Sequence, residues 1–392
     1  MVRLAEVAQQ AGVSISTASR ALNRPALVSP PVVDRVQAVA RSLGYAPNPF
    51  ARSLRLQASR TLGLLIPDNT NPFFAEVARG IEAACFRAGY TLILCNSDRS
   101  IEKEAAQARV LVEKRVDGVL FFNTSDASLA TIRWLHDRGL PVVLLERRLP
   151  AGAAAGGPAG DLLRDAGSAG GEAPAVAVDC VLSDNIAGMR AAVEHLAQLG
   201  HRRVACLAGD LGAAHYAERV AAFRDAMQAV GLEAAPALIW SGLVTYADGQ
   251  RTAAELLRRP DRPTALICTT DTLAIGALRG AAQLGLTVPG DVSVIGYGNT
   301  EVTAYTHPPL TCVAQDKLAV GALGVRVLLR RLQARAQARR AHAPPAPRPQ
   351  VHIIPTRLVV RESTGAPPTD ELGRVHGSGA GTPQVTGTAA WP

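Results

Sequence analysis

From residue 61 onward, short runs of apolar residues alternate with helical stretches, and this alternation constrains the fold more than any other feature. The runs occupy residues 61–66, 91–94, 117–122, 142–145, 204–207, 265–268 and 292–296. Alternating strand-like and helix-like segments predict parallel sheets joined by right-handed helical crossovers. Hydrophobic residues are 48% of the chain but aromatic ones only 4%, a balance typical of parallel sheets covered by helices. We therefore expect an α/β fold for the bulk of the chain.

The first 60 residues differ from the rest in charge. They contain eight arginines against Glu6 and Asp34, a net charge of +6 out of the +8 of the whole chain. A compact basic segment on a nearly neutral body is the electrostatic pattern of nucleic-acid binding proteins. An ordinary solvated surface is the alternative that charge alone leaves open.

The same basic segment has the pattern of three short helices. Residues 3–10 have the apolar spacing of a helix, and Gly12 follows in a tight turn; Ser14 can cap a second helix over 15–22. Helix, glycine turn and helix form the helix-turn-helix pattern, in which the second helix places its N-terminal residues in the major groove. A third helix follows, with Ser29 as its expected cap.

Asn48 and Pro49 repeat the cap-then-proline start and open a very short segment, residues 50–56. Such a segment is too short to be a stable helix alone, because the cost of nucleation is not offset. We expect it to order only against DNA or a second subunit. A plain linker is the alternative.

The chain resembles the lactose-repressor family of bacterial transcriptional regulators. The resemblance is carried by residues 4–14, 19–23, 43–48 and 51–54, and it continues more loosely to about residue 363. It implies that Ile15, Ser16 and Arg20 reach bases in the major groove. It also implies that Leu54, on a hinge helix, wedges into a minor-groove step and kinks the duplex.

The chemistry of these side chains determines how strongly each can discriminate between bases. Arg20 is the best candidate for a bidentate contact with guanine, worth about 1–3 kcal/mol of discrimination, whereas Ser16 is less selective and Ile15 makes only apolar contacts. Contacts with the DNA backbone are expected from Arg3, Thr17, Asn23, Arg24, Asn48, Arg52 and Arg55. The expected partner is a near-palindromic double-stranded operator read by a homodimer.

The resemblance gives the body two lobes, like a periplasmic sugar-binding protein, with a cleft between them. Ligands of such folds lie at the carboxyl ends of the strands. The residues expected near the effector are Phe73, Phe74, Arg147, Arg219, Asp271 and Gln315. Phenylalanine faces suit a sugar ring, and the polar groups suit its hydroxyls. The alternatives are a core position for the phenylalanines, a helix cap for Asp271 and a rim position for Arg147.

One position departs from the family pattern. Relatives that bind sugars or purines commonly have Tyr or Phe followed by Asp, where this chain has Tyr297 and Gly298. With that carboxylate missing and Arg147 and Arg219 present, the cleft is expected to tolerate an anion. We therefore expect a carbohydrate-type effector, with a sugar phosphate or sugar acid as the narrower candidate. A purine-like co-repressor is the alternative within the family, and a simple turn is the alternative role of Gly298.

The expected organisation follows from these patterns. It comprises a helix-turn-helix domain (1–47), a hinge helix and linker (48–60), an effector-binding and dimerisation domain (61–363) and a disordered tail (364–392). Lobe 1 takes about 61–183 and 316–354, and lobe 2 takes about 184–315 and 355–363. Two segments without core periodicity, 150–174 and 334–349, are expected to be mobile insertions.

Several classes of protein are disfavoured by what the sequence lacks. Neither a signal segment nor an uninterrupted run of 18 apolar residues is present, so we expect a cytoplasmic protein outside the membrane. The six cysteines form no C-x-x-C pair, so reduced core thiols are expected, with neither metal nor cofactor. The phosphate loop, nucleophile elbow and zinc motif of common enzymes are missing, so we expect no enzyme. A transport-type solute-binding protein is the remaining alternative, which the basic head disfavours. Because the tail has no leucine heptads, a dimer is expected.

Overall fold

The computed structural model describes residues 2–45, 58–122, 126–148, 178–338 and 348–369. The chain divides into two compact units, a head that ends at Arg60 and a body that begins at Thr61. Asn48, Arg52, Leu54 and Arg55 of the expected hinge lie outside the described residues, as does the expected insertion at 150–174.

The described part of the head is helical. Its elements are α1 (Leu4–Gln10), α2 (Ile15–Asn23), the 3-10 turn η1 (Pro25–Leu27) and α3 (Pro30–Ser42). Val7, Ala18 and Val36 are fully buried where α1, α2 and α3 meet. Gly12, between α1 and α2, has a φ of +64°, a left-handed conformation that glycine adopts without a Cβ clash. The expected helix-turn-helix is therefore present.

The two expected helix caps of the head differ. The Oγ of Ser14 accepts a hydrogen bond of 3.1 Å from the backbone N–H of Thr17, so Ser14 caps α2 as predicted. Ser29 precedes α3, but its side chain makes no cap hydrogen bond. The start of α3 instead relies on Pro30, whose fixed φ suits the first position of a helix.

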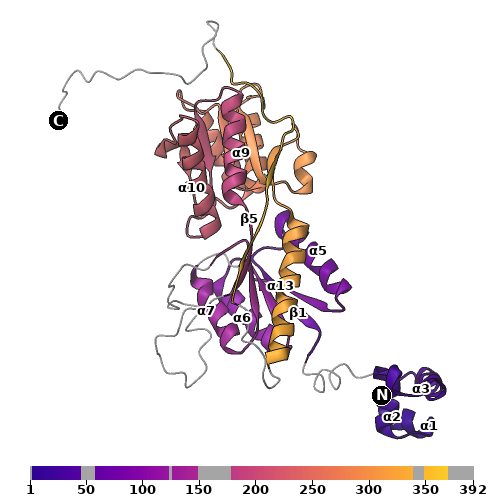
Figure 1. Ribbon diagram of the computed structural model, residues 1–392. Helices are drawn as coiled ribbons and strands as arrows, with labels where there is room; N and C mark the ends of the chain where they lie inside the picture. The colour runs from indigo at the N-terminus through magenta and orange to yellow at the C-terminus, as the bar shows by residue number, and fades with distance from the viewer. Residues whose placement is uncertain (1, 46–57, 123–125, 149–177, 339–347, 370–392) are drawn as a thin grey trace, which may run out of the picture. The chain divides into compact units, whose positions relative to one another are not determined.

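The first sheet of the body is parallel throughout and defines the N-terminal lobe (Figure 1). Its strands, in spatial order, are β11 (Val351–Ile354), β5 (Asp179–Ser183), β4 (Val142–Leu145), β3 (Gly118–Phe121), β1 (Thr61–Ile66) and β2 (Thr91–Asn96). The helical elements of this lobe are α5 (Pro72–Arg87), α6 (Ile101–Glu113), η2 (Asp126–Ser128), α7 (Leu129–Asp137) and α13 (Lys317–Ala338).

The second sheet defines the C-terminal lobe and is parallel except for one edge strand. Its strands, in spatial order, are β12 (Arg357–Val359), β10 (Thr311–Ala314), β9 (Ser293–Gly298), β8 (Ala265–Cys268), β6 (Val204–Leu207) and β7 (Ile239–Trp240), with β12 antiparallel to β10. The helical elements are α9 (Asn185–Gln198), α10 (Ala214–Ala229), η3 (Pro236–Leu238), α11 (Tyr246–Leu257), α12 (Asp271–Gln283) and η4 (Glu301–Ala304). The expected α/β fold class is confirmed.

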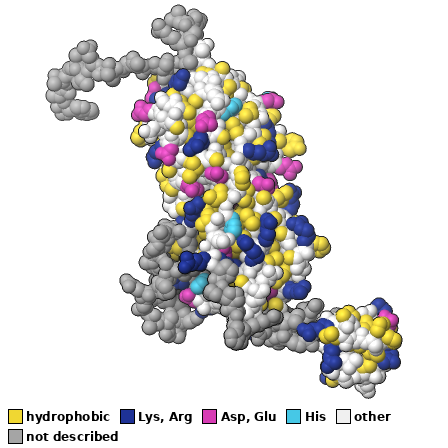
Figure 2. All heavy atoms as spheres, in the orientation of Figure 1, with side chains coloured by type: hydrophobic (Ala, Val, Ile, Leu, Met, Phe, Trp, Pro, Cys, Tyr) yellow, Lys and Arg dark blue, Asp and Glu magenta, His cyan; other side chains and the backbone are white. Residues whose placement is uncertain are grey.

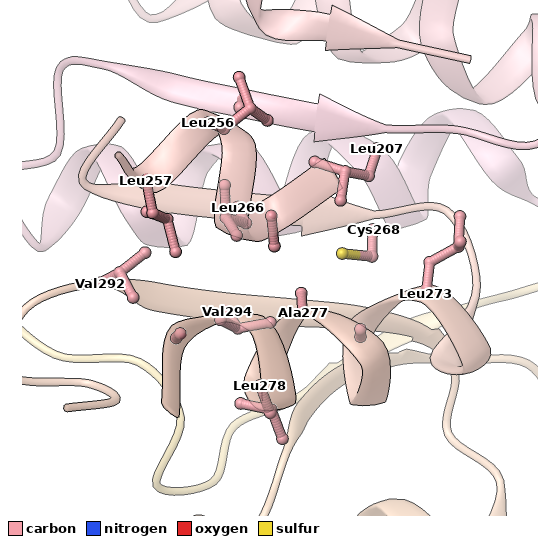
Figure 3. Packing of buried hydrophobic residues seen from close by; sticks show 14 of the residues in the cluster. Leu207, Leu256, Leu257, Leu266, Cys268, Leu273, Ala277, Leu278, Val292 and Val294 are labelled. Atoms are coloured by element: carbon pink, nitrogen blue, oxygen red, sulfur yellow. The ribbon is translucent and has the colours of Figure 1, made fainter. Parts of the chain in front are cut away.

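Each face of each sheet is covered by an apolar layer. In the C-terminal lobe, Leu266 and Cys268 of β8 and Val294 of β9 are completely buried against α11 and α12 (Figure 3). Completely buried strands read as continuous apolar runs, which is why β6, β8 and β9 were visible in the sequence. Strands β7, β11 and β12 were missed because they are short and lie at sheet edges. Strand β5 is buried inside its sheet, but Asp179 and Ser183 at its ends leave an apolar run of only three residues.

The chain crosses between the lobes three times. It passes from β5 to α9 at residues 183–185, from β10 to α13 at 314–317, and from β11 to β12 at 354–357. Each lobe is therefore assembled from segments that are distant in sequence. The crossovers place the carboxyl ends of both sets of strands next to each other, where ligands of such folds bind.

Two expectations about irregular segments were wrong in part. Residues 334–338 of the insertion expected at 334–349 are helical, because α13 continues to Ala338 through residues that favour helix. The tail expected to be disordered from residue 364 is ordered at its start. Thr364 Oγ1 hydrogen-bonds His195 Nε2 (3.0 Å), and the carbonyl of Gly365 hydrogen-bonds His201 Nε2 (2.9 Å). Residues 339–347 and 370–392 lie outside the described part.

Candidate functional site

The head exposes one face of α2. Ala18 and Ala21 of this helix are completely buried, whereas Ile15 is 56% exposed and Ser16 and Arg20 are also exposed. An exposed isoleucine at the start of a helix has no role in the core of the head. Arginine side chains are visible on the surface of this unit, whose sequence contains no lysine (Figure 2). The three residues expected to read bases therefore share an accessible face.

The expected backbone-contacting residues are positioned less uniformly. Arg3 is exposed and pairs with Glu6 at 3.2 Å, so part of its charge is neutralised within α1. Thr17 hydrogen-bonds the Ser14 hydroxyl (2.8 Å), and Asn23 donates to the Ser19 carbonyl (2.8 Å). Arg24, which follows α2, is exposed.

A cavity of about 250 Å³ lies in the body at the carboxyl ends of strands from both lobes. Five of the six residues expected near the effector line it: Phe73, Phe74, Arg219, Asp271 and Gln315. Arg147 does not belong to the lining, although its side chain is only 2% exposed. Its neighbour Glu146, which follows β4 with a φ of +60°, lines the cavity instead.

Three phenylalanines form an aromatic wall in the N-terminal lobe. Phe73 and Phe74 begin α5, and Phe122 follows β3. The rings of Phe73 and Phe74 meet edge to face at 5.4 Å between centroids, and those of Phe74 and Phe122 at 5.3 Å. Edge-to-face contacts hold aromatic rings in a defined orientation. This wall offers a ligand a preformed apolar surface.

Arg219 is the central charged residue of the C-terminal lobe. Its side chain is 4% exposed, and its guanidinium carbon lies 3.8 Å from the ring centroid of Tyr297. Its Nε donates to Asn185 Oδ1 (2.9 Å) and its Nη1 donates to the Thr269 carbonyl (2.7 Å). Among the described residues, no carboxylate lies within salt-bridge distance of it, so a buried cation faces the cavity with neutral partners only.

Asp271 is held by the loop that follows β9. Its Oδ2 accepts hydrogen bonds from the backbone N–H (2.7 Å) and hydroxyl (2.9 Å) of Thr300. Its Oδ1 accepts a weaker bond from Cys312 Sγ (3.4 Å). Burial raises the pKa of Asp271 although these hydrogen bonds favour the carboxylate. Asp271 is also the first residue of α12, while Thr270 provides the cap, so Asp271 does not serve as that cap.

The structure changes the interpretation of Gly298. This residue has a φ of +132°, which other residues rarely adopt, and a Cβ there would lie 2.8 Å from Asp271 Oδ2. The carboxylate of Asp271 thus occupies the space next to residue 298. Residue 298 supplies no carboxylate, as the sequence shows, but Glu146 and Asp271 both line the cavity, so acidic groups are present there.

Glu146 and Gln315 line the cavity and hydrogen-bond to Ser183, which lies at the first crossover between the lobes. Glu146 Oε1 accepts a hydrogen bond from Ser183 Oγ (2.7 Å), and Gln315 Nε2 donates to Glu146 Oε2 and Ser183 Oγ (both 3.0 Å). Burial raises the pKa of Glu146, while the Ser183 hydrogen bond acts in the opposite direction. Gln315 therefore lines the cavity as expected, but its amide group is also part of the connection between the lobes.

His215, which was not among the residues expected near the effector, lines the cavity in the first turn of α10. Its ring lies 4.0 Å from that of Tyr216. Burial, reinforced by Arg219, Arg147 and Arg99, lowers the pKa of His215 well below its usual value, so the imidazole is neutral at physiological pH. A lone histidine in a helical segment carries no sequence signal that would distinguish it from a core residue.

Other kinds of site find no support in the described part of the chain. All six cysteines are buried as free thiols. Within the described residues, His, Cys, Asp and Glu form no group of three or more that would hold a metal ion. Among the described helices, none combines the length and the apolar character needed to cross a membrane.

The chain is similar to known regulators over nearly its whole length. The model of bacterial regulatory proteins of the lacI family matches residues 3–48, and that of the periplasmic binding protein-like domain matches residues 193–364. The HTH-type transcriptional repressor PurR of Aliivibrio salmonicida (strain LFI1238) is 33% identical over 341 residues, covering 87% of this chain and 95% of the relative.

Solved structures agree with this relationship. The Lac repressor dimer bound to operator and the anti-inducer ONPF is 25% identical, with a TM-score of 0.76 over 93% of this chain and 99% of that chain. The complex of the transcriptional regulator CelR with cellobiose is 30% identical, with a TM-score of 0.65 over 93% and 100%. The resemblance stated from the sequence is confirmed, and the chain belongs to the lacI family of bacterial regulatory proteins as a DNA-binding transcriptional repressor.

Proposed function

We propose that this repressor is controlled by a small polar ligand that binds in the cavity between the two lobes. The observation that carries the proposal is Arg219, a buried guanidinium that lines the cavity without an ion-pair partner among the described residues. Burying a charge is costly unless it is compensated, so such a residue favours a ligand that supplies hydrogen-bond acceptors. The cavity is slightly smaller than the roughly 300–1,000 Å³ of sites for drug-sized molecules, which favours a small effector.

A carbohydrate-type effector is the first candidate. Hydroxyl groups both donate and accept, so one sugar can accept from Arg219 and donate to Asp271 or Glu146 while its ring face packs on Phe73 or Phe74. The CelR structure, which holds cellobiose, supports a carbohydrate in this fold. A sugar phosphate or sugar acid remains a narrower form of this candidate, and Arg219 is the residue that would favour its anionic group.

A purine-like ligand is the second candidate, favoured by two observations. Relatives named PurR match 87% of the chain, and the three phenylalanines provide an apolar wall for a planar base. The ring nitrogens and exocyclic groups of a base include both donors and acceptors, so it too suits Arg219 together with Asp271. With such a ligand, the protein would act as a co-repressor-dependent regulator.

The test of this function is a thermal-shift screen of the full chain with D-ribose, cellobiose, ribose 5-phosphate, gluconate, guanine and hypoxanthine. A ligand that binds only the folded state stabilises it by about 4 kcal/mol at 1,000 times its dissociation constant, so a true effector raises the melting temperature clearly. Stabilisation by the sugars alone supports the first candidate, and stabilisation by the bases alone supports the second. If every compound leaves the melting temperature unchanged, both effector classes fail.

For DNA binding, we propose that Ile15, Ser16 and Arg20 contact bases in the major groove of a near-palindromic operator. The exposure of these side chains on one face of α2 supports this assignment. Backbone contacts by Arg3, Thr17, Asn23 and Arg24, and the roles of Asn48, Arg52, Leu54 and Arg55 in a hinge over 48–60, remain part of the proposal. The protein would act as a cytoplasmic homodimer, without catalysis.

A selection of DNA fragments from a random library by the full chain tests the assignment. Arg20→Ala is expected to lose the preferred site while retaining weak, salt-sensitive binding to any duplex. An Arg20→Ala protein that selects the same site would show that another residue reads the bases.

A further inference from the structure

Arg219 is held in place by a residue that does not itself line the cavity. Asn185 is the first residue of α9, directly after the chain crosses from β5 into the C-terminal lobe. Its side chain is buried, at 3% exposure, and it belongs to no motif singled out in the sequence. Asn185 therefore contacts Arg219 from outside the cavity lining and can act on a ligand only through lining residues such as Arg219.

The hydrogen bonds of Asn185 fix the orientation of its amide. The Oδ1 atom accepts from Arg219 Nε (2.9 Å) and from the Tyr297 hydroxyl (3.1 Å). The Nδ2 atom donates to Glu218 Oε2 (2.6 Å). Two donors on one side and one carboxylate on the other determine which end of the amide carries the oxygen.

These contacts leave Arg219 little freedom. Asn185 holds Nε, the Thr269 carbonyl holds Nη1, and the ring of Tyr297 covers one face of the guanidinium. A planar group with two in-plane hydrogen bonds and a stacked face has one defined orientation. Within the described residues, Nη2 makes no hydrogen bond, so its two N–H groups are available to a ligand.

Asn185 also lies where two crossovers meet. The carboxylate of the preceding residue, Asp184, caps α9 by accepting from the Ala187 N–H (2.9 Å), and its carbonyl accepts from Thr356 Oγ1 (2.8 Å). Thr356 belongs to the crossover between β11 and β12. A shift of the lobes at these crossovers would therefore displace Asn185, and through it the Nε of Arg219.

We propose that Asn185 is a positioning residue that orients Arg219 for the effector and couples that orientation to the arrangement of the two lobes. The proposal rests on the proposed function, in which Arg219 binds the effector. Coupling of this kind is reciprocal, because a ligand that requires one orientation of Arg219 also favours the lobe arrangement that provides it.

The neighbouring Glu218 allows a matched set of variants. Asn185→Ala removes all three hydrogen bonds. Asn185→Asp keeps the acceptor for Arg219 but places a carboxylate against Glu218, and like charges at this separation repel. Adding Glu218→Gln reverses the donor and acceptor of that hydrogen bond and restores the original net charge. Glu218→Gln alone keeps an acceptor for Asn185 and serves as the control.

The first measurement needs no ligand. In the full chain labelled with ¹⁵N-arginine, the Nε–H signal of Arg219 is assigned by its absence from Arg219→Lys. We expect slow hydrogen exchange of this Nε–H in the wild type, fast exchange in Asn185→Ala and Asn185→Asp, and slow exchange again in the Asn185→Asp, Glu218→Gln double variant. Slow exchange in Asn185→Ala would overturn the proposal, as would failure of the double variant to restore the protection that Asn185→Asp loses.

The second measurement is calorimetric titration with D-ribose, ribose 5-phosphate and hypoxanthine. For any of these that binds the wild type, we expect about 10-fold weaker binding to Asn185→Asp and recovery to within about threefold in the double variant. Equal affinity of wild type and Asn185→Asp would overturn the proposal even if the Nε–H exchange had changed. If none of the probes binds the wild type, the effector classes proposed above fail, and the exchange measurement still decides the role of Asn185.

Discussion

The two lobes contribute different chemistry to the same cavity. The N-terminal lobe supplies the edge-to-face rings of Phe73, Phe74 and Phe122 and the buried carboxyl group of Glu146. The C-terminal lobe supplies Arg219 and Asp271. Apolar contact is not directional, so the aromatic wall can bind any ring of suitable size. Buried charged groups reject ligands that leave them unpaired. We therefore expect the aromatic wall to accept many ligands, and the buried charged groups, Arg219 above all, to determine which ligand is bound.

Removal of Arg219 is the strongest test of this division. Arg219→Ala is expected to weaken effector binding by about 10- to 100-fold, because a hydrogen bond to a charged group is worth about 1.5–3 kcal/mol. Arg219→Lys keeps the charge but cannot reach both Asn185 and Thr269, so an intermediate loss is expected. Calorimetric titration measures both, with the urea midpoint as the control for folding. If Arg219→Ala binds the effector as tightly as the wild type, Arg219 does not select the ligand, and the aromatic wall takes that role.

The second test concerns Gly298, which borders Asp271 in the C-terminal lobe. Gly298→Ala is expected to lower the free energy of unfolding by about 1–3 kcal/mol, because its φ is unfavourable for alanine and the new Cβ meets the Asp271 carboxylate. Gly285→Ala is the matched control, since Gly285 also has a positive φ but has open space around its Cβ position. Urea denaturation compares the two. Equal losses would mean that backbone strain alone, and not Asp271, excludes a side chain at residue 298.

Truncation of the aromatic wall is expected to have a smaller effect on affinity. Phe74→Ala should weaken binding by about 3- to 10-fold, since an aromatic contact contributes about 0.5–1.5 kcal/mol beyond buried area. Phe74→Leu keeps most of the apolar surface and should bind nearly as the wild type. The ratio of affinities for a sugar and a nucleobase should change little in either variant. A large change in the ratio of sugar affinity to nucleobase affinity would mean that the aromatic wall also contributes to selectivity.

The lobes should also respond differently to acid. Burial lowers the pKa of His201, in the C-terminal lobe, to about 4. Because the unfolded histidine titrates near 6.5, the unfolded state binds the extra proton first, and stability is lost as the pH falls from 6.5 towards 4. In the N-terminal lobe, burial raises the pKa of Glu104, so its protonation relieves a penalty at low pH.

We expect a loss of about 1 kcal/mol from His201 between pH 6.5 and about 5.5. Stability measured by urea denaturation across this range, with His201→Gln for comparison, checks the assignment. Hydrogen exchange should show that the C-terminal lobe opens first on acidification. If the free energy of unfolding of His201→Gln depends on pH as that of the wild type does, the acid sensitivity comes from other groups.

The sequence predicted what depends on local patterns. Gly12 and Ser14 define the turn and the cap between two helices of the head through their own backbone preferences. Arg219 and Asp271 were placed in the cavity from the family pattern, and Asp271 lies at the start of α12, shortly after the end of β8. Gly12 and Ser14 can be found one at a time, because their surroundings are set by nearby residues. Arg219 and Asp271 have partners distant in the sequence, so only the family pattern pointed to them.

What the sequence could not predict depends on contacts between distant segments. Asn185 matters because a crossover brings it behind Arg219, 34 positions away in the chain. The surroundings of Gly298 could not be predicted, because its conformation and the carboxylate beside it are visible only in three dimensions. Glu146 rather than Arg147 lines the cavity, since the direction of a side chain after a strand depends on the backbone turn there, and Glu146 has a φ of +60°.

The three crossovers have a consequence for the synthesis of the protein. The N-terminal lobe begins with β1 but is completed only by α13 and the edge strand β11, which lie beyond almost all of the C-terminal lobe in the sequence. At translation rates of 5–20 residues per second, β11 leaves the ribosome roughly 10–30 s after its neighbour β5. During that interval, an apolar sheet edge and the surface that α13 later covers are exposed to solvent. The nascent chain is therefore most vulnerable to aggregation while its second lobe is being made.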